Sequence, residues 1–283
     1  MIAITGASGQ LGRLVIEQLL EKVPANDVVA LVRDVNKVTD LSARGVQVKA
    51  ADYTQPASLE AALQGVNKLL LISSSEVGQR VAQHRNVIEA AVKAGVKLVA
   101  YTSLLHADKS PLALAEEHNK TEALLKDSGL PHVLLRNGWY TENYAGSIPE
   151  ALKHGVFIGS AGEGKISSAT RDDFAAAAVA VLTQEGQAGK VYELAGDESY
   201  TLADLAAEIS KQSGKNIGYR NLSETDFTAA LVSVGLPDAL AAVVADSDVG
   251  ASKGGLFDDG KQLSRLIGRA TTPLSAVVRA TLK

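Results

Sequence analysis

The sequence predicts an α/β fold, in which a doubly wound parallel sheet carries helices on both faces and a small, mostly helical C-terminal lobe follows. Two observations support this prediction. Short apolar runs alternate with segments of helical periodicity through the first 145 residues, which is typical of repeated strand–helix–strand units. After residue 145 this rhythm changes, and four glycines crowd residues 155–164.

Local signals define the elements of the first part. Residues 28–32 are all aliphatic, as in a strand that is buried on both faces. In residues 11–23 apolar side chains recur every three or four positions, which is the spacing of a helical face. A helix over 79–94 is expected to turn Val81, Ile88 and Val92 toward the core. The expected strands are residues 2–5, 28–32, 46–50, 68–72, 98–102 and 132–135, and the expected helices are residues 11–23, 58–63, 79–94 and 112–128.

The second part is expected to form helices at 172–182 and 202–212, a strand at 191–194 and further helices up to a glycine-rich loop at 250–255. No linker is long enough to separate independently folding domains. The expected organisation is therefore a dinucleotide-binding domain at 1–145 and a substrate-side lobe at 146–283 that returns some elements to the sheet.

Composition excludes several classes of protein. The formal net charge of −4 provides no basic field that would attract nucleic acid or anionic lipid. Without cysteine the chain forms no disulfide, zinc finger or thiolate nucleophile, and its five histidines show no metal-ligand spacing. No secretory signal and no apolar run near the ~18 residues of a spanning helix is visible. We expect a cytoplasmic protein without membrane insertion and without a bound metal.

A glycine-rich turn joins the first expected strand to the first expected helix. Glycines at such a place allow a tight turn, close approach of the backbone to a pyrophosphate and close packing of helix on strand. Free N–H groups and the helix dipole then favour an anion. A simple tight turn is the alternative, but the context favours a Rossmann dinucleotide site. The turn consists of Gly6, Ala7, Ser8, Gly9, Gln10, Leu11 and Gly12.

Arg33 indicates which dinucleotide binds. An NAD enzyme usually places an acidic residue at the end of the second strand, where it holds the ribose 2′-hydroxyl. Here that strand ends at Arg33, whose guanidinium can pair with a 2′-phosphate. A solvated arginine is the alternative. NADP(H) is therefore the expected cofactor, and the adjacent Asp34 leaves dual use open.

Polar residues also follow the third and fourth expected strands. Asp52 is expected near the adenine, or is a solvated turn residue. Ser73, Ser74 and Ser75 offer hydroxyl donors and allow close approach on the nicotinamide side, unless they form an ordinary polar turn.

The turn and the Thr102-Ser103 strand end resemble the short-chain dehydrogenase/reductase superfamily, whose enzymes protonate their product with a Tyr-x-x-x-Lys pair. None of the seven tyrosines has Lys four residues later. This places the chain in the atypical, NmrA-like branch, where it resembles the bacterial type-2 NAD(P)H:quinone oxidoreductases over its whole length. The resemblance lies in residues 70–80 (LLISSSEVGQR), 101–108 (YTSLLHAD), 134–144 (LLRNGWYTENY) and 251–259 (ASKGGLFDD).

The resemblance implies an NADPH-dependent reductase that transfers hydride to a quinone without flavin. A quinone is more electrophilic than a simple ketone, so positioning the ring is expected to be most of the protein's contribution. The family implies that the cofactor is held by the glycine turn, Arg33, the three serines and the loop of Asn137, Gly138, Trp139, Tyr140, Thr141 and Glu142.

Within that loop, Tyr140 and Asn137 are the candidate substrate-positioning residues. The loop holds the only tryptophan of the chain, and aromatic faces suit a flat quinone or a similar small aromatic acceptor. Packing between the two parts of the chain is the alternative role for Trp139 and Tyr140. His118 and Lys120 are possible proton donors, although exposed residues of these types are more often simply solvated.

Two other functions remain open at this point. An NmrA-like redox sensor would bind the dinucleotide and a protein partner without catalysis. An azo or triphenylmethane dye reductase would share the cofactor site but use another acceptor. The oligomeric state is open, with a homodimer as one possibility.

Overall fold

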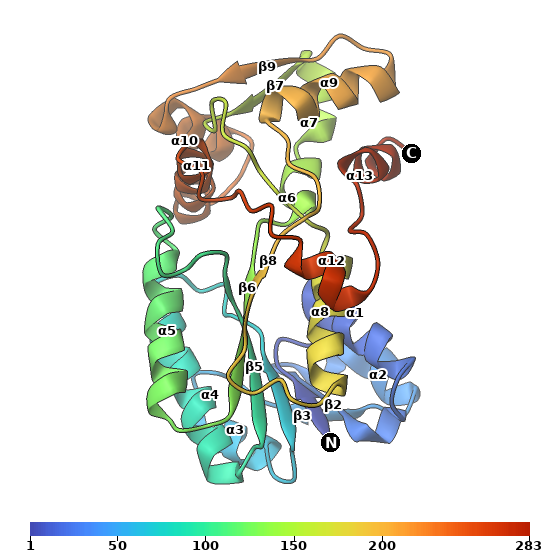
Figure 1. Cartoon of the computed structure of the whole chain (residues 1–283), viewed down its shortest axis with the longest axis vertical. Coiled ribbons are helices and arrows are strands. Elements are labelled where there is room, and N and C mark those ends of the chain that lie inside the picture. Colours follow the sequence, from blue (N-terminus) through green and yellow to red (C-terminus); the bar gives the residue numbers. More distant parts are fainter. The chain divides into compact units, whose positions relative to one another are not determined.

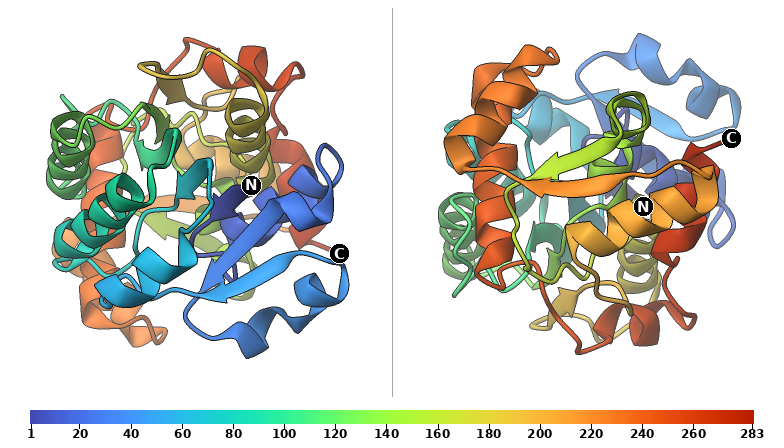
Figure 2. Two further views of the ribbon diagram at one scale, coloured as in Figure 1. Left: turned by 90° about the horizontal axis from the view of Figure 1, so that it is seen from below. Right: turned by 90° about the horizontal axis from the view of Figure 1, so that it is seen from above.

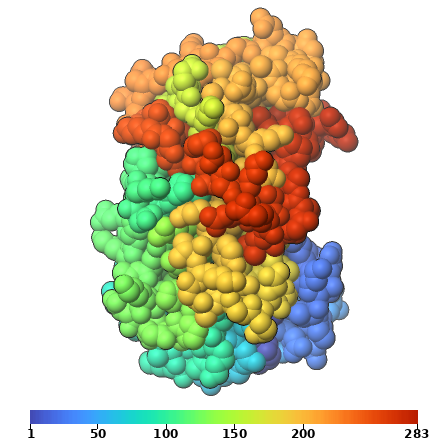
Figure 3. Space-filling view, viewed as in Figure 1, coloured from blue at the N-terminus to red at the C-terminus, as the bar shows by residue number.

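The computed structural model describes residues 1–283 and gathers them into two compact units. The first unit contains residues 1–107, 116–137 and 171–192, and the second contains residues 108–115, 138–170 and 193–283. Residues 171–192, drawn in yellow, form part of the surface of the first unit in this view (Figure 3). The single domain boundary expected after residue 145 stays a prediction.

The predicted doubly wound sheet is confirmed (Figure 1). Its strands follow the order β3-β2-β1-β4-β5-β6-β8, and every neighbouring pair from β3 to β6 is parallel. The order reverses between β1 and β4, where such sheets bind their ligands beyond the carboxyl ends of the strands. The strands are β1 (Ile2–Ile4), β2 (Val28–Val32), β3 (Gln47–Ala50), β4 (Lys68–Leu71), β5 (Leu98–Leu104), β6 (His132–Asn137) and β8 (Val191–Leu194).

Helices cover both faces of this sheet, as the left view of Figure 2 shows. On one face, aliphatic side chains of α3, α4 and α5 pack on the strands in one apolar cluster. On the other face α1 packs on α8, whose alanines allow close approach. The helices and turns of this unit are α1 (Gln10–Leu20), η1 (Ala25–Asp27), η2 (Val35–Val38), α2 (Thr39–Ala43), α3 (Pro56–Ala62), α4 (Arg80–Ala94), α5 (Ala115–Asp127) and α8 (Arg171–Thr183).

The predicted core face of α4 was wrong at Val92 and only partly right at Val81. Ile88 is buried as expected, but Val81 is half-buried and Val92 is 46% exposed. The buried face instead includes the polar side chains of Gln83 and His84. Apolar periodicity placed this face wrongly because polar residues that support the loop after β4 occupy part of it.

The second unit contains a small parallel pair of strands that the sequence analysis did not predict. Strand β7 (Val156–Gly159) pairs with β9 (Gly218–Asn221), and the right view of Figure 2 shows the two arrows side by side. The remaining elements are helical, as expected. They are α6 (Thr141–Ala145), α7 (Ile148–His154), α9 (Leu202–Ser213), α10 (Glu224–Ser233), α11 (Asp238–Ser252), α12 (Gln262–Ile267) and α13 (Leu274–Thr281).

A buried carboxylate connects three segments of the second unit. Asp248 of α11 accepts hydrogen bonds from the Tyr144 hydroxyl at 3.0 Å and from the Ser160 amide at 2.9 Å. Burial raises the pKa of Asp248 to about 6. Gly159 leaves room for this carboxylate, because a Cβ there would lie 2.7 Å from Asp248 Oδ2.

No helix of the structure combines the length and the apolar character needed to cross a membrane.

Candidate dinucleotide site

A pocket of about 260 Å³ opens at the carboxyl ends of β1, β2, β3 and β4, on both sides of the point where the strand order reverses. This is the place where doubly wound sheets bind nucleotides. All of its lining residues belong to the first unit. They are Gly6, Ser8, Gly9, Leu31, Val32, Arg33, Ala51, Asp52, Tyr53, Ile72, Ser73, Ser74, Ser75, Glu76 and Gln83.

The glycines of the first turn are required by its geometry. Gly6 has a φ of +57°, a conformation that residues with a Cβ rarely adopt. A Cβ at Gly12 would lie 2.4 Å from the Gly6 carbonyl oxygen and 2.8 Å from Ala7 Cα. Both of these are backbone atoms, so no side-chain rotation could relieve the contact. The absence of a side chain at Gly12 therefore lets α1 begin directly against the turn.

The turn and the start of α1 carry free backbone donors, and Ser8 among them lines the pocket. The Ala7 amide donates to the Leu31 carbonyl at 3.2 Å, and the Gly9 amide donates to the Gly6 carbonyl at 2.9 Å. The amides of Ser8, Gln10 and Leu11 have no acceptor within the chain, and no side chain caps the start of α1. The first turn of α1 also carries no acidic residue. Unpaired amides at a helix start fit a phosphate anion.

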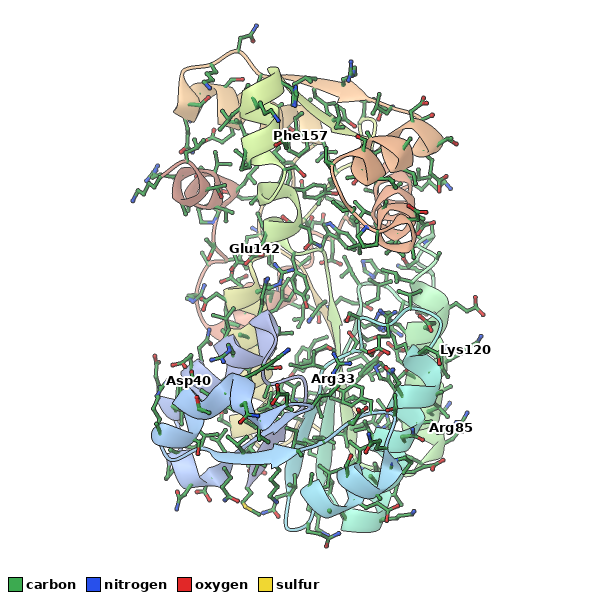
Figure 4. The ribbon with its side chains drawn as sticks, turned by 180° about the vertical axis from the view of Figure 1, so that it is seen from behind. Arg33, Asp40, Arg85, Lys120, Glu142 and Phe157 are labelled. Carbon is green, nitrogen blue, oxygen red and sulfur yellow. The ribbon has the colours of Figure 1, made fainter.

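Arg33 follows β2 at the rim of the pocket, as predicted (Figure 4). Its side chain is 72% exposed, and Nη1 donates to Glu76 Oε1 at 3.0 Å. Asp34 does not line the pocket, because its carboxylate accepts from the Asn36 amide at 3.0 Å and caps η2. The carboxylate that forms an ion pair with Arg33 is therefore Glu76 rather than Asp34, its neighbour in the sequence.

The loop formed by Ser73, Ser74 and Ser75, here called the serine loop, has its backbone fixed by hydrogen bonds from neighbouring side chains. The Ser73 amide donates to Thr102 Oγ1 at 2.8 Å, and the Ser74 amide donates to His84 Nε2 at 2.9 Å. Arg80 Nε donates to the Ser74 carbonyl at 2.7 Å. The hydroxyls of Ser73 and Ser75 make no hydrogen bond within the chain and line the pocket.

The proton on His84 is assigned by its partners. Nε2 accepts from the Ser74 amide, so the ring carries its proton on Nδ1, which lies 2.9 Å from Thr121 Oγ1. Thr121 Oγ1 in turn donates to the Glu117 carbonyl at 3.0 Å. Burial, with the nearby Arg80 guanidinium, lowers the pKa of His84 to about 3. A neutral imidazole thus fixes the serine loop.

A second group of hydrogen bonds joins the ends of β1, β3 and β4. Thr5 Oγ1 donates to the Leu70 carbonyl at 3.1 Å and accepts from the Ile72 amide at 2.9 Å. The Tyr53 hydroxyl lies 2.5 Å from Thr5 Oγ1 and 2.8 Å from the Ile72 carbonyl. These hydrogen bonds fix the wall of the pocket between the glycine turn and the serine loop.

The predicted Asn137–Glu142 loop is divided between the two units. Asn137 ends β6 in the first unit, where it is buried and its Oδ1 has no hydrogen-bond partner. The rest of the loop belongs to the second unit, where Trp139 and Tyr140 are half-buried. There Thr141 Oγ1 lies 2.8 Å from Ser168 Oγ, which lies 2.6 Å from the Tyr200 hydroxyl.

Helix α5 carries the two possible proton donors, His118 and Lys120, and neither is free for that role. His118 is buried rather than exposed, it shares a 2.7 Å hydrogen bond with the Tyr101 hydroxyl, and burial lowers its pKa well below the usual range. Lys120 points outward and pairs with Glu116 at 2.6 Å (Figure 4). Glu122 binds Arg136 at 2.7 Å and accepts from Ser103 Oγ at 2.6 Å. Each of these groups has a structural partner.

Sequence reasoning missed Glu76, Gln83 and His84. The rule that ligands bind beyond strand ends does point to Tyr53, which directly follows Asp52 after β3, but it gives this side chain no role. Glu76 lies within the 70–80 stretch that carries the family resemblance, but nothing in that stretch indicates a contact with Arg33. Gln83 and His84 lie in α4, where no motif marks them. Only a view of the buried face of α4 reveals that their side chains support the serine loop and the pocket.

Comparison with known proteins gives consistent results. The model of a family described as NAD(P)H-binding matches residues 6–185. Quinone oxidoreductase 2 of Escherichia coli K12 is 66% identical over 278 residues, which are 98% of this chain and 97% of that protein. A crystal structure of the Escherichia coli NADPH-dependent quinone oxidoreductase with NADPH has a TM-score of 0.98 at 65% identity and covers 100% of both chains. The triphenylmethane reductase of Citrobacter sp. with NADP(H) has a TM-score of 0.96 at 39% identity, with the same coverage.

Proposed function

The chain belongs to the NAD(P)H-binding family, in its NmrA-like branch, and from this premise we propose that it is an NADPH-dependent quinone reductase that uses no flavin. The observation that carries the proposal is the 66% identity to a quinone oxidoreductase along nearly the whole chain. The pocket fits the cofactor independently, because it combines free amides at a helix start with a guanidinium at the end of β2.

Residues of the pocket and of the segments next to it have distinct roles in binding. The free amides of Ser8, Gln10 and Leu11 hold the diphosphate, and Arg33 pairs with the 2′-phosphate. The hydroxyls of Ser73 and Ser75 donate to the nicotinamide-side ribose. The buried Oδ1 of Asn137 accepts from the carboxamide, since a buried acceptor without a partner is costly until a donor arrives. When bound, NADPH supplies the hydride.

The groups around α5 agree with an acceptor that needs little acid catalysis. His118 is neutral and buried, and Glu122 is tied to Arg136. Reduction of a quinone forms phenolic rather than alkoxide oxygens, which require less help from a general acid. Holding the acceptor ring in place is then most of the protein's task.

An acceptor panel tests the function. Purified protein is mixed with NADPH and with a series of quinones, azo dyes and triphenylmethane dyes, each with and without added flavin. We expect NADPH oxidation that depends on the quinone, does not increase with flavin and is slower with the dyes. A chain that binds NADPH in calorimetry but reduces no acceptor would be a sensor, and a faster dye reaction would make it a dye reductase.

Tyr140→Ala is expected to impair quinone turnover more than cofactor binding. Loss of the aromatic face removes stacking worth about 1 kcal/mol, so kcat/KM for the quinone should fall roughly fivefold while the Kd of NADPH changes by a smaller factor. Steady-state kinetics and calorimetry separate the two quantities. Tyr219→Ala, at a half-buried tyrosine of β9, is the matched control. Normal quinone kinetics in the Tyr140 variant would remove this residue from the site.

The cytoplasmic location, the absence of a nucleic-acid partner and the homodimer stay predictions.

A further inference from the structure

The guanidinium that should receive the 2′-phosphate already has a carboxylate partner. Arg33 follows β2 and Glu76 follows β4, yet Nη1 and Oε1 lie 3.0 Å apart and both residues line the same pocket. Glu76 is 45% exposed, so solvent and ligand can both reach this ion pair. An exposed pair of this kind is weak enough to exchange partners.

Glu76 is held in this position by its own surroundings. Gln83 Nε2 donates to Glu76 Oε2 at 2.7 Å, and the Glu76 amide donates to Ser74 Oγ at 3.1 Å. A carboxylate only accepts hydrogen bonds, so Gln83 must turn its amino group toward Glu76. Its Oε1 is consequently buried without a partner, which is an arrangement that costs free energy. The position of the carboxylate is therefore built into the pocket.

We propose that Glu76 sets the preference between NADPH and NADH, because it competes with the 2′-phosphate for Arg33. This inference rests on the proposed function. A phosphate at Arg33 must displace the carboxylate and remain beside its negative charge, which lowers the affinity for NADPH. A ribose 2′-hydroxyl can instead donate to the carboxylate, as it does to the acidic residue of NAD enzymes. Glu76 is thus the carboxylate that allows NADH to bind as well, a role that the sequence suggested for Asp34.

The variant Glu76→Gln tests this competition. It keeps the shape of the side chain and removes its charge, so Arg33 loses an ionic partner. Calorimetry should show a Kd for NADPH that is about two- to fivefold lower, which corresponds to the usual worth of an exposed ion pair. The Kd for NADH should stay the same or rise. The gain for NADPH should shrink as salt is added, since salt screens exposed charges.

Glu60→Gln is the matched control, because Glu60 of α3 forms an ion pair with Lys93 at similar exposure and does not line the pocket. It should leave both Kd values unchanged. An unchanged ratio of the two Kd values in Glu76→Gln would overturn the inference, provided that the unaltered protein binds NADPH. Failure of the unaltered protein to bind either nucleotide would instead overturn the proposed function.

A double variant separates competition from simple repulsion. In an Arg33→Ala background there is no guanidinium to release, so Glu76→Gln should improve NADPH binding much less than it does in the unaltered protein. An equal improvement in both backgrounds would show that Glu76 acts only by repelling the phosphate, and competition for Arg33 would then be wrong.

Discussion

Gly12→Ala is expected to raise the Kd of NADPH about a hundredfold. The added Cβ would lie 2.4 Å from the Gly6 carbonyl oxygen and 2.8 Å from Ala7 Cα, far inside van der Waals contact with atoms that cannot rotate away. Helix α1 must shift, and the amides at its start then lose their alignment with the diphosphate. Two misplaced hydrogen bonds to a charged group, at about 1.5 kcal/mol each, account for a loss of this size.

The same substitution should lower the free energy of unfolding by about 1–3 kcal/mol, as is usual for overpacking. Calorimetry with NADPH and chemical denaturation measure the two effects. Gly218→Ala is the control, because nothing lies within 4 Å of a Cβ at that exposed strand position. It should change neither quantity. A Gly12 variant that binds NADPH as tightly as the unaltered protein would show that the turn does not hold the diphosphate.

Much of the first unit could be predicted from the sequence because its signals are local. The five residues of β2 are all aliphatic and all buried, and the structure gives this strand the expected bounds. The glycine turn is defined by spacing, and its geometry requires glycine where the pattern has it. Strands β5 and β6 both extend two residues beyond their expected ends, because polar residues such as Ser103 and Arg136 continue the pairing.

What the sequence could not predict depends on contacts between distant residues. Arg33 and Glu76 are 43 residues apart, and no spacing rule joins the ends of β2 and β4. The buried face of α4 carries His84 because the loop above it needs an acceptor, which hydrophobic periodicity cannot show. The short strands β7 and β9 pair although some sixty residues separate them in the sequence. An isolated pair of strands is only marginally stable, so the pairing depends on the packing around it.

Arg33→Ala should separate the two nucleotides more sharply than any other single change at the pocket. A 2′-phosphate loses a charge-assisted partner, which at this exposed position is worth about 2 kcal/mol, so the Kd of NADPH should rise roughly thirtyfold. NADH has no group that needs this guanidinium, and its Kd should change less than about twofold. Calorimetry with both nucleotides at low and at high salt measures the effect.

The control for this prediction is Arg85→Ala, at an arginine of α4 that points outward and does not line the pocket (Figure 4). Because both variants remove one positive charge, any general electrostatic effect on a polyanionic ligand appears equally in each. Only the contact at the end of β2 can then account for a loss confined to Arg33 and to NADPH. Equal losses for NADPH and NADH in Arg33→Ala would mean that this side chain supports the pocket as a whole, and the preference for the phosphorylated cofactor would have to come from elsewhere.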